Sequence, residues 1–217
     1  GRRDDVVDLL RHHDRLAEVF SHRLVHDATG RSGILIRRFD RYIDEHGIAH
    51  RLAAEDACQL SNRYPSDKYL LTAEQCSEAL LTQVFSPRIA APEVFRQFVY
   101  AWLTGNGDLH AKNLSIVENR KGQYELSPIY DIPSTAPYGD KSMALLLSGK
   151  KDGLSRRRFL TFAHNIGVSS RVAEHVLEEV LTGTEHLAEQ AREELPFDSH
   201  RMKELLKVLK NRRRSLL

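Results

Sequence analysis

The chain has 217 residues and a formal net charge of +2, and it is 41% hydrophobic and 29% charged. This length suits one domain with a hydrophobic core of its own, and this composition is typical of soluble globular proteins. A net charge so close to zero does not by itself indicate a nucleic-acid-binding protein. No run of the sequence approaches the ~20 apolar residues of a membrane span.

The ends and the cysteines add two expectations. The sequence shows no secretory signal and begins with Gly rather than Met, so we expect a cytoplasmic protein and treat this chain as a fragment or a processed form. Cys58 and Cys76 are the two cysteines, and they lack the spacing of metal ligands. We expect two buried thiols in a reducing cytosol.

The first quarter of the chain predicts a helix, a hairpin and a second helix. Apolar residues recur at roughly helical spacing over residues 4–20. Residues 22–27 and 34–39 flank a Gly-rich turn and predict a β-hairpin. Residues 44–50 are a turn-rich connector, and residues 53–61 predict a short helix.

We assign Glu55 and Asp56 no role in a site. Both lie near the start of that short predicted helix, where acidic side chains suit the helix dipole.

Two further helices are predicted before the centre of the chain. Thr72 and Gln75 form the capping-box pattern of a helix that runs to about residue 85. Ser86-Pro87 breaks this helix, and Ala91-Pro-Glu begins a long apolar helix.

The strongest chemical signal is Thr104-Gly-Asn-Gly-Asp-Leu-His-Ala-Lys-Asn-Leu-Ser-Ile116. Asp108 and Asn113 have the spacing of a protein-kinase catalytic loop, in which the Asp accepts the proton of the attacking hydroxyl and the Asn holds Mg²⁺. Asp131 follows one predicted hairpin later, where a kinase has its second Mg²⁺ carboxylate. The pattern predicts Asp108 as the catalytic base, Asn113 and Asp131 as metal ligands, and ATP as the phosphoryl donor.

This spacing alone is a weak signal. Asn and Asp favour turns, so the alternative is a loop that only ends a helix and starts a strand. The order of the elements favours a kinase C-lobe: an apolar helix (94–103), the loop, two apolar runs (113–117 and 123–129) joined by a turn-rich segment (118–122), and then Tyr130-Asp131.

The remainder of the chain is predicted to be helical. Residues 132–153 are expected to form a loop with one apolar run at 143–147. Three helices are predicted to close the chain, at 155–166, 169–195 and 198–214, with Pro196 between the last two. The fold class is therefore mainly α with a small β component (α+β).

The basic residues are unevenly spread. Two clusters of one sign are Arg156-Arg-Arg158 and Lys207-Val-Leu-Lys-Asn-Arg-Arg-Arg214. A charge run is usually the solvated face of a helix, and the alternative is a surface that binds a phosphate backbone.

Taken together, the motifs resemble the C-terminal part of the HipA family, the serine/threonine kinase toxins of bacterial toxin–antitoxin pairs. The resemblance covers about half of the chain. Four segments carry it in the same order: Ile34-Leu-Ile-Arg-Arg-Phe-Asp-Arg41; Arg51-Leu-Ala-Ala-Glu-Asp-Ala-Cys-Gln59 with Pro65-Ser-Asp-Lys-Tyr69; Gly107-Asp-Leu-His-Ala-Lys-Asn-Leu-Ser115; and Leu126-Ser-Pro-Ile-Tyr-Asp-Ile-Pro-Ser134.

The resemblance implies nucleotide contacts at the hinge between the two lobes of a kinase. There the backbone at Arg37, Arg38 and Phe39 would receive the adenine. Arg37 stands where the family usually has Glu, so a backbone contact survives but a contact from a Glu side chain does not. The alternative for Phe39 is an ordinary core aromatic.

It also implies that His110, Ala111, Lys112 and Asn113 belong to the nucleotide site. Lys112 would suit a γ-phosphate, and Tyr130 would pack against the nucleotide. The alternatives are a structural histidine that orients the loop and a solvated lysine.

We treat residues 1–217 as a single HipA-like C-terminal kinase lobe. It has a hinge hairpin at 22–40, a catalytic loop and metal hairpin at 104–134, and C-terminal helices at 155–215. A working kinase also needs an N-lobe that covers the phosphates, and only about 33 residues precede the hinge strand. We expect the N-lobe to be absent and the isolated chain to be weakly active or inactive.

The resemblance further implies an unidentified protein substrate, a HipB-like DNA-binding antitoxin, operator DNA bound through the basic helices, and no membrane. Two alternatives remain. One is a small-molecule phosphotransferase of the aminoglycoside or choline type, although those enzymes usually carry His where this chain has Asn106. The other is a non-catalytic helical module that binds an antitoxin and DNA.

Overall fold

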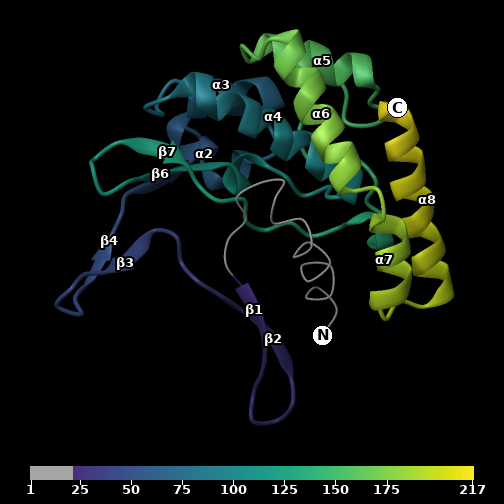
Figure 1. Cartoon of the computed structure of the whole chain (residues 1–217), viewed down its shortest axis with the longest axis horizontal. Coiled ribbons are helices and arrows are strands. Elements are labelled where there is room, and N and C mark those ends of the chain that lie inside the picture. The colour runs from purple at the N-terminus through teal and green to yellow at the C-terminus, as the bar shows by residue number, and fades with distance from the viewer. Residues whose placement is uncertain (1–21) are drawn as a thin grey trace.

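The computed structural model describes residues 22–217, in which helices outweigh strands. Helices hold 46% of the residues and strands 16%, which confirms the expected mainly α fold with a small β component. Figure 1 shows the helices gathered in one body, with the hairpins β1–β2 and β3–β4 extending from it. The helix predicted for residues 4–20 lies outside the described residues.

The first hairpin is present as predicted. Strand β1 (His22–His26) pairs antiparallel with β2 (Ser32–Ile36). The second strand ends at Ile36, three residues before its predicted end.

The turn-rich connector predicted at 44–50 is the turn of a second hairpin, and only its last two residues belong to a strand. Strand β3 (Arg41–Ile43) pairs with β4 (Ala49–Arg51). Asp44 closes the turn between them, because its carboxylate accepts from the backbone N–H of His46 and of Ile48, each at 2.9 Å. The two strands were not predicted, because three residues each are too few to show an alternating pattern.

The predicted helix at 53–61 is half strand. Strand β5 (Ala54–Asp56) pairs with β6 (Ser115–Glu118), which pairs with β7 (Tyr124–Leu126). Glu55 therefore lies in a strand rather than in the first turn of a helix. Asp56 ends the strand and caps the four-residue helix α2 (Ala57–Leu60). Pairing with β6, distant in sequence, overrides the local helical pattern.

Helix α3 (Ala73–Leu81) has the predicted capping box of Thr72 and Gln75. The long helix α4 (Pro87–Thr104) begins before the predicted Ala91, because Pro87 stands in the first turn, where a missing N–H costs nothing. Three short 3₁₀ turns complete the middle of the chain: η2 (Pro65–Asp67), η3 (Ala111–Asn113) and η4 (Ala136–Tyr138).

Four helices, not three, close the chain: α5 (Arg156–Asn165), α6 (Ser170–Gly183), α7 (Leu187–Glu194) and α8 (Ser199–Leu216). The predicted helix at 169–195 is wrong because it breaks at Thr184. There the Thr184 hydroxyl donates to Val180 O at 2.7 Å, and Gly183 is a poor helix former.

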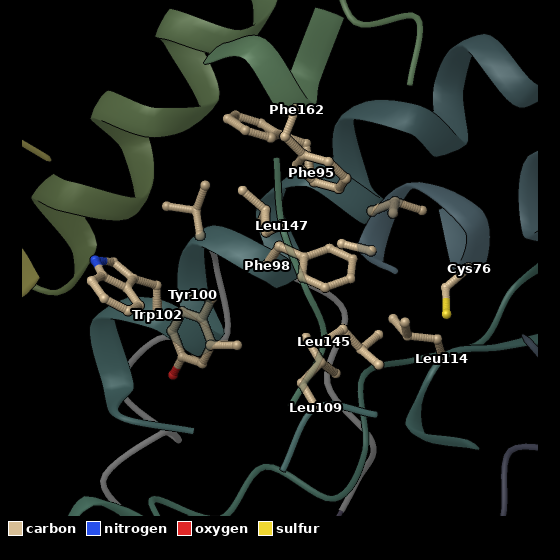
Figure 2. Packing of buried hydrophobic residues seen from close by; sticks show 14 of the residues in the cluster. Cys76, Phe95, Phe98, Tyr100, Trp102, Leu109, Leu114, Leu145, Leu147 and Phe162 are labelled. Atoms are coloured by element: carbon tan, nitrogen blue, oxygen red, sulfur yellow. The ribbon is translucent and has the colours of Figure 1, made fainter. Parts of the chain in front are cut away.

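The hydrophobic core forms around α4. Phe95 and Phe98 of α4 pack against Phe159 and Phe162 of α5, with the Phe98 and Phe162 ring centroids 5.0 Å apart. Figure 2 shows Leu145 and Leu147 beside these rings, so the predicted apolar run at 143–147 crosses the core. Cys58 and Cys76 are buried free thiols as predicted, and burial raises the pKa of Cys76 to about 12.

A buried cation fastens α8 to the end of α4. The Arg212 guanidinium lies 4.2 Å from the centroid of the Trp102 ring and donates to Trp102 O at 2.9 Å and to Lys141 O. Burial lowers the pKa of Arg212 to about 10, which leaves it charged at neutral pH. None of the helices within residues 22–217 combines the length and hydropathy of a membrane span.

We predict that Phe162→Ala lowers the free energy of unfolding by about 3–5 kcal/mol, because it opens a cavity in the core where the side chain is fully buried. Urea unfolding followed by circular dichroism measures the change. The matched control is Phe85→Ala, whose side chain is 65% exposed; it is expected to cost less than about 1 kcal/mol. Equal losses in the two variants would contradict the packing described here.

Candidate active site

A cavity of about 690 Å³ has three walls. They are formed by β2 and the segment that follows it, by strand β5, and by the segment that follows β7. This volume falls in the range of small-molecule sites. Its lining residues are Ile34, Ile36, Arg37, Arg38, Phe39, Asp40, Ala54, Glu55, Asp56, Gln59, Ser115, Tyr130, Asp131, Ile132 and Pro133. The five predicted nucleotide residues among them are Arg37, Arg38, Phe39, Tyr130 and Asp131.

The loop at 104–116, which the sequence predicts to be catalytic and which is called the catalytic loop below, begins where α4 ends. Gly105 ends the helix with a φ of +75°, a left-handed conformation that favours glycine. A Cβ on Gly107 would lie 2.4 Å from the Thr135 hydroxyl and 2.6 Å from Ser142 O, so any other residue would displace the loop. Asn106 fixes the next turn, because its side-chain oxygen accepts from the Asp108 N–H at 2.8 Å.

Asp108 is held from one side and open on the other. The Tyr69 hydroxyl donates to Asp108 Oδ1 at 2.9 Å, and the Asp108 side chain is 37% exposed. One carboxylate oxygen is thus engaged, while the other remains available to accept a proton from solvent or a substrate.

Asn113 brings together the residues that the sequence predicted as base and metal ligands. Its Nδ2 donates to Asp108 O at 3.0 Å and to Asp131 Oδ2 at 3.2 Å. Asn113 is buried at the end of η3, whereas Asp131 is exposed. The three residues therefore form one cluster although a hairpin separates them in sequence.

The donor set of this cluster fits Mg²⁺. The Asn113 side-chain oxygen and the Asp131 carboxylate are hard ligands, and Mg²⁺ is usually bound by one or two such protein groups together with substrate phosphates. Within residues 22–217 no group of three or more His, Cys, Asp or Glu could enclose a metal ion. The exposed Asp131 instead presents its oxygens at the edge of the cavity.

Lys112 makes a contact that the sequence did not suggest. Its ammonium lies 2.6 Å from Asp56 Oδ2, and this carboxylate is buried at the end of β5. The pair ties the catalytic loop to the wall of the cavity. The γ-phosphate role of Lys112 stays a prediction.

Tyr130 holds the loop at a second point. Its hydroxyl donates to Lys112 O at 2.7 Å and lies 2.5 Å from the Ser115 hydroxyl. Burial raises the pKa of Tyr130, so it remains a neutral donor. The Phe39 ring packs on it with centroids 5.6 Å apart. Phe39 is half-buried and lines the cavity, so it is not an ordinary core aromatic.

At the hinge, Arg37 and Arg38 are exposed and reach solvent over the cavity. Arg38 donates two hydrogen bonds to the Asp40 carboxylate, at 2.7 and 2.6 Å. These bonds, with the charges of Arg38 and Arg41, hold the pKa of Asp40 below its usual value despite burial. The hinge therefore carries its own charge pair next to the cavity.

His110 and Ala111 turn away from the cavity. Both are buried, His110 faces Lys68 and Tyr69, and the Ala111 N–H donates to Lys68 O at 3.1 Å. Neither residue lines the cavity.

Residues 12–188 match the family model of the HipA-like C-terminal domain. The chain belongs to the HipA-like C-terminal domain family. The match covers most of the sequence and includes the hinge, the catalytic loop and Asp131.

Curated relatives of this HipA-like chain carry kinase names. It is 32% identical over 149 residues to "Putative kinase Y4mE" of Sinorhizobium fredii, covering 65% of this chain and 35% of that protein. It is 26% identical over 160 residues to a "Putative kinase" of Haemophilus influenzae, covering 64% of this chain and 46% of that protein. The chain thus spans between a third and a half of these relatives.

Solved structures show the same fold. The complex of the Shewanella oneidensis HipA, HipB and operator DNA contains a chain that superposes with a TM-score of 0.76 at 18% identity, over 97% of this chain and 55% of that one. The Helicobacter pylori proinflammatory kinase CtkA gives a TM-score of 0.58 at 14% identity, over 98% of this chain and 82% of that one.

The HipA-like site contains four residues to which the sequence analysis assigned no role. Glu55 and Asp56 line the cavity, and Lys68 and Tyr69 contact the catalytic loop. The last two lie in Pro65-Ser-Asp-Lys-Tyr69, a segment that carries the resemblance to the family. The resemblance of this segment to the family was the one sign in the sequence that Lys68 and Tyr69 matter. The sequence does not tell which loop the segment contacts in the folded chain.

We predict that Lys112→Met lowers the free energy of unfolding by about 1–3 kcal/mol, because it leaves the buried Asp56 carboxylate without its cation. Chemical denaturation of the two single variants, Lys112→Met and Asp56→Asn, and of the double variant measures the coupling energy between the two side chains. Asn is chosen at position 56 because it can still cap α2. The double variant should cost less than the sum of the two single changes. The control cycle uses Arg31 and Asp27, which are 83% and 48% exposed and should show no measurable coupling, because solvent and salt screen an exposed pair. Additive losses at Lys112 and Asp56 would contradict the pairing.

Proposed function

We propose that the chain is the catalytic lobe of an ATP- and Mg²⁺-dependent serine/threonine protein kinase of the HipA toxin type, acting in the cytoplasm. The observation that carries the proposal is the position of Asn113, which is hydrogen-bonded to both Asp108 and Asp131 at the edge of a cavity large enough for a nucleotide. Family membership and the kinase names of the relatives support it.

In this proposal each group has one task. Asp108, half-exposed and hydrogen-bonded by Tyr69, accepts the proton of a substrate serine or threonine hydroxyl. Asn113 and Asp131 would hold Mg²⁺, which when bound neutralises charge on the phosphates. The backbone at 37–39 and the Tyr130–Phe39 contact would receive the adenine, and the substrate protein is unidentified.

We predict that the chain binds Mg-ATP weakly in calorimetry and that Asp131→Ala lowers the affinity at least about tenfold, since it removes a metal carboxylate. Asp108→Asn should leave binding within about twofold and reduce phosphoryl transfer to protein serine or threonine by about 10²–10⁴-fold. Chelating Mg²⁺ with EDTA should act on the wild type as Asp131→Ala does.

The control is Glu193→Ala, an exposed acid of α7, which should change neither quantity. Wild-type chain that ignores Mg-ATP, or binding that does not depend on Asp131, would overturn the proposal. Transfer to an aminoglycoside or choline in place of protein would favour the small-molecule phosphotransferase.

A second proposal concerns DNA. Lys203, Lys207, Lys210 and Arg214 are exposed residues of α8, and steps of four, three and four residues place them on one helical face. Within residues 22–217 none of the four forms an ion pair with an acid. Such a stripe suits a phosphate backbone, and the similar Shewanella oneidensis chain is in a complex with HipB and operator DNA. We propose that this chain has a HipB-like antitoxin and operator DNA as partners.

We predict that Lys207→Gln with Lys210→Gln weakens binding to duplex DNA and lowers the slope of log affinity against log salt by about 2, because two phosphate contacts are lost. Fluorescence anisotropy over a salt series, with antitoxin present and absent, measures this. Lys121→Gln, in the turn between β6 and β7, is the control. An unchanged slope in the double variant would contradict a phosphate contact by α8.

A further inference from the structure

Lys68 is a lysine beside the catalytic loop that has no acidic partner among the described residues. It follows η2 in the segment between α2 and α3. Its ammonium Nζ lies 2.8 Å from His110 Nε2 and 4.9 Å from the centroid of the Tyr69 ring. Lys68 O accepts from the Ala111 N–H at 3.1 Å, so backbone and side chain of this residue both engage the loop.

The contact with Lys68 determines the state of His110. An ammonium can only donate, so Nε2 must accept and the ring must be neutral with its proton on Nδ1. Burial lowers the pKa of His110, which agrees with a neutral ring. Nδ1 is buried and has no hydrogen-bond partner within the described part of the chain. The imidazole thus makes a single hydrogen bond, and that bond orients Lys68.

Tyr69 completes the surroundings of the base. Its hydroxyl donates to Asp108 Oδ1 at 2.9 Å, and burial followed by the Asp108 contact raises the pKa of Tyr69, so it stays a donor. His110 Nε2 lies 4.0 Å from the same Oδ1. The Lys68 ammonium and the Asp108 carboxylate thus lie against the same two side chains, His110 and Tyr69, and no ion pair joins them in the described part of the chain.

Two other cations near the site are already engaged, whereas Arg37 on the cavity wall is exposed to solvent. Lys112 is paired with Asp56 at 2.6 Å, and Arg38 with Asp40. Lys68 is half-buried and rests on a neutral ring, an arrangement that costs desolvation without a matching anion. A cation held in this way is suited to an anion that arrives only with substrate.

We propose that Lys68 is a catalytic residue that neutralises the transferring phosphoryl group, and that His110 is its positioning residue; this rests on the proposed kinase function. In the transfer, the substrate hydroxyl oxygen bonds to the γ-phosphorus and its proton passes to Asp108. The bond from that phosphorus to the β–γ bridging oxygen breaks, and its electron pair leaves on ADP. Charge spread over the equatorial oxygens in this step is what a preorganised cation stabilises.

The test compares Lys68→Met, Lys68→Arg and the control Lys121→Met in the full chain. Each is assayed for phosphoryl transfer, and its affinities for MgADP and for MgADP with aluminium fluoride, a transition-state analogue, are measured by calorimetry. We expect Lys68→Met to lower kcat by about 10²–10³-fold, with the KM for ATP and the MgADP affinity within about threefold. Its affinity for the analogue should fall at least about tenfold, and Lys68→Arg should recover part of both losses.

The outcomes separate the two proposals. If the wild type binds the analogue, Asp131→Ala abolishes that binding and Lys68→Met matches the wild type, the role of Lys68 is refuted and the kinase stands. Equal losses for MgADP and the analogue would show a structural role and also refute it. A wild type that binds neither ligand refutes both proposals.

Should Lys68→Met fail to fold, the wild type still provides a test. The ¹⁵N resonance of the Lys68 ammonium should shift when the analogue is added to the MgADP-bound chain. No shift would overturn the proposal.

Discussion

The carboxamide of Asn113 is the contact on which the site depends. Asp108 and Asp131 come from different loops, and Asn113 joins these loops. Its Nδ2 donates to the Asp131 carboxylate and to the backbone carbonyl of Asp108. Gln97 of α4 in turn donates to Asn113 O at 3.4 Å. This hydrogen bond connects the cluster to α4, the helix around which the hydrophobic core forms.

The catalytic loop is fixed along its length by contacts of different kinds. Close backbone packing at Gly107 sets its start, and the Lys68 carbonyl holds Ala111 in its middle. The Lys112–Asp56 pair and the Tyr130 hydroxyl hold its end against β5 and β6. Because these contacts come from segments on both sides of the loop, the loop is positioned by the whole fold rather than by its own sequence.

The parts of this site that sequence could predict are those encoded by local spacing. The capping box at Thr72 and the hairpin before Asp131 are short-range patterns, and the structure has them as predicted. The short interval from Asp108 to Asn113 lets the Asn113 side chain reach the Asp108 carbonyl, while their roles as base and metal ligand stay predictions. The strand at 54–56 could not be found in this way, because its register is set by residues 115–117 and its own letters favour a helix. The break at Thr184 was missed because the helical period continues across it.

The contacts that the sequence did not predict join residues that are far apart in the chain. Asp56 and Lys112 are separated by 56 residues, and Lys68 and His110 by 42, so neither pair leaves a local pattern. A resemblance to a family indicated that these segments matter, but it did not say which side chains meet. Only the tertiary structure separates a lysine that is neutralised by an acid from one that is not.

The Arg212 contact has a consequence for how the protein matures during synthesis. Trp102 O lies at the end of α4, directly before the catalytic loop, and the guanidinium that satisfies it comes 110 residues later in the chain. A ribosome adds residues from the N-terminus onward, so the loop bearing Asp108 is released long before its anchoring helix exists. Until α8 has emerged and docked, the end of α4 lacks this support. The geometry of the loop that bears Asp108 is therefore completed only after α8 has been made.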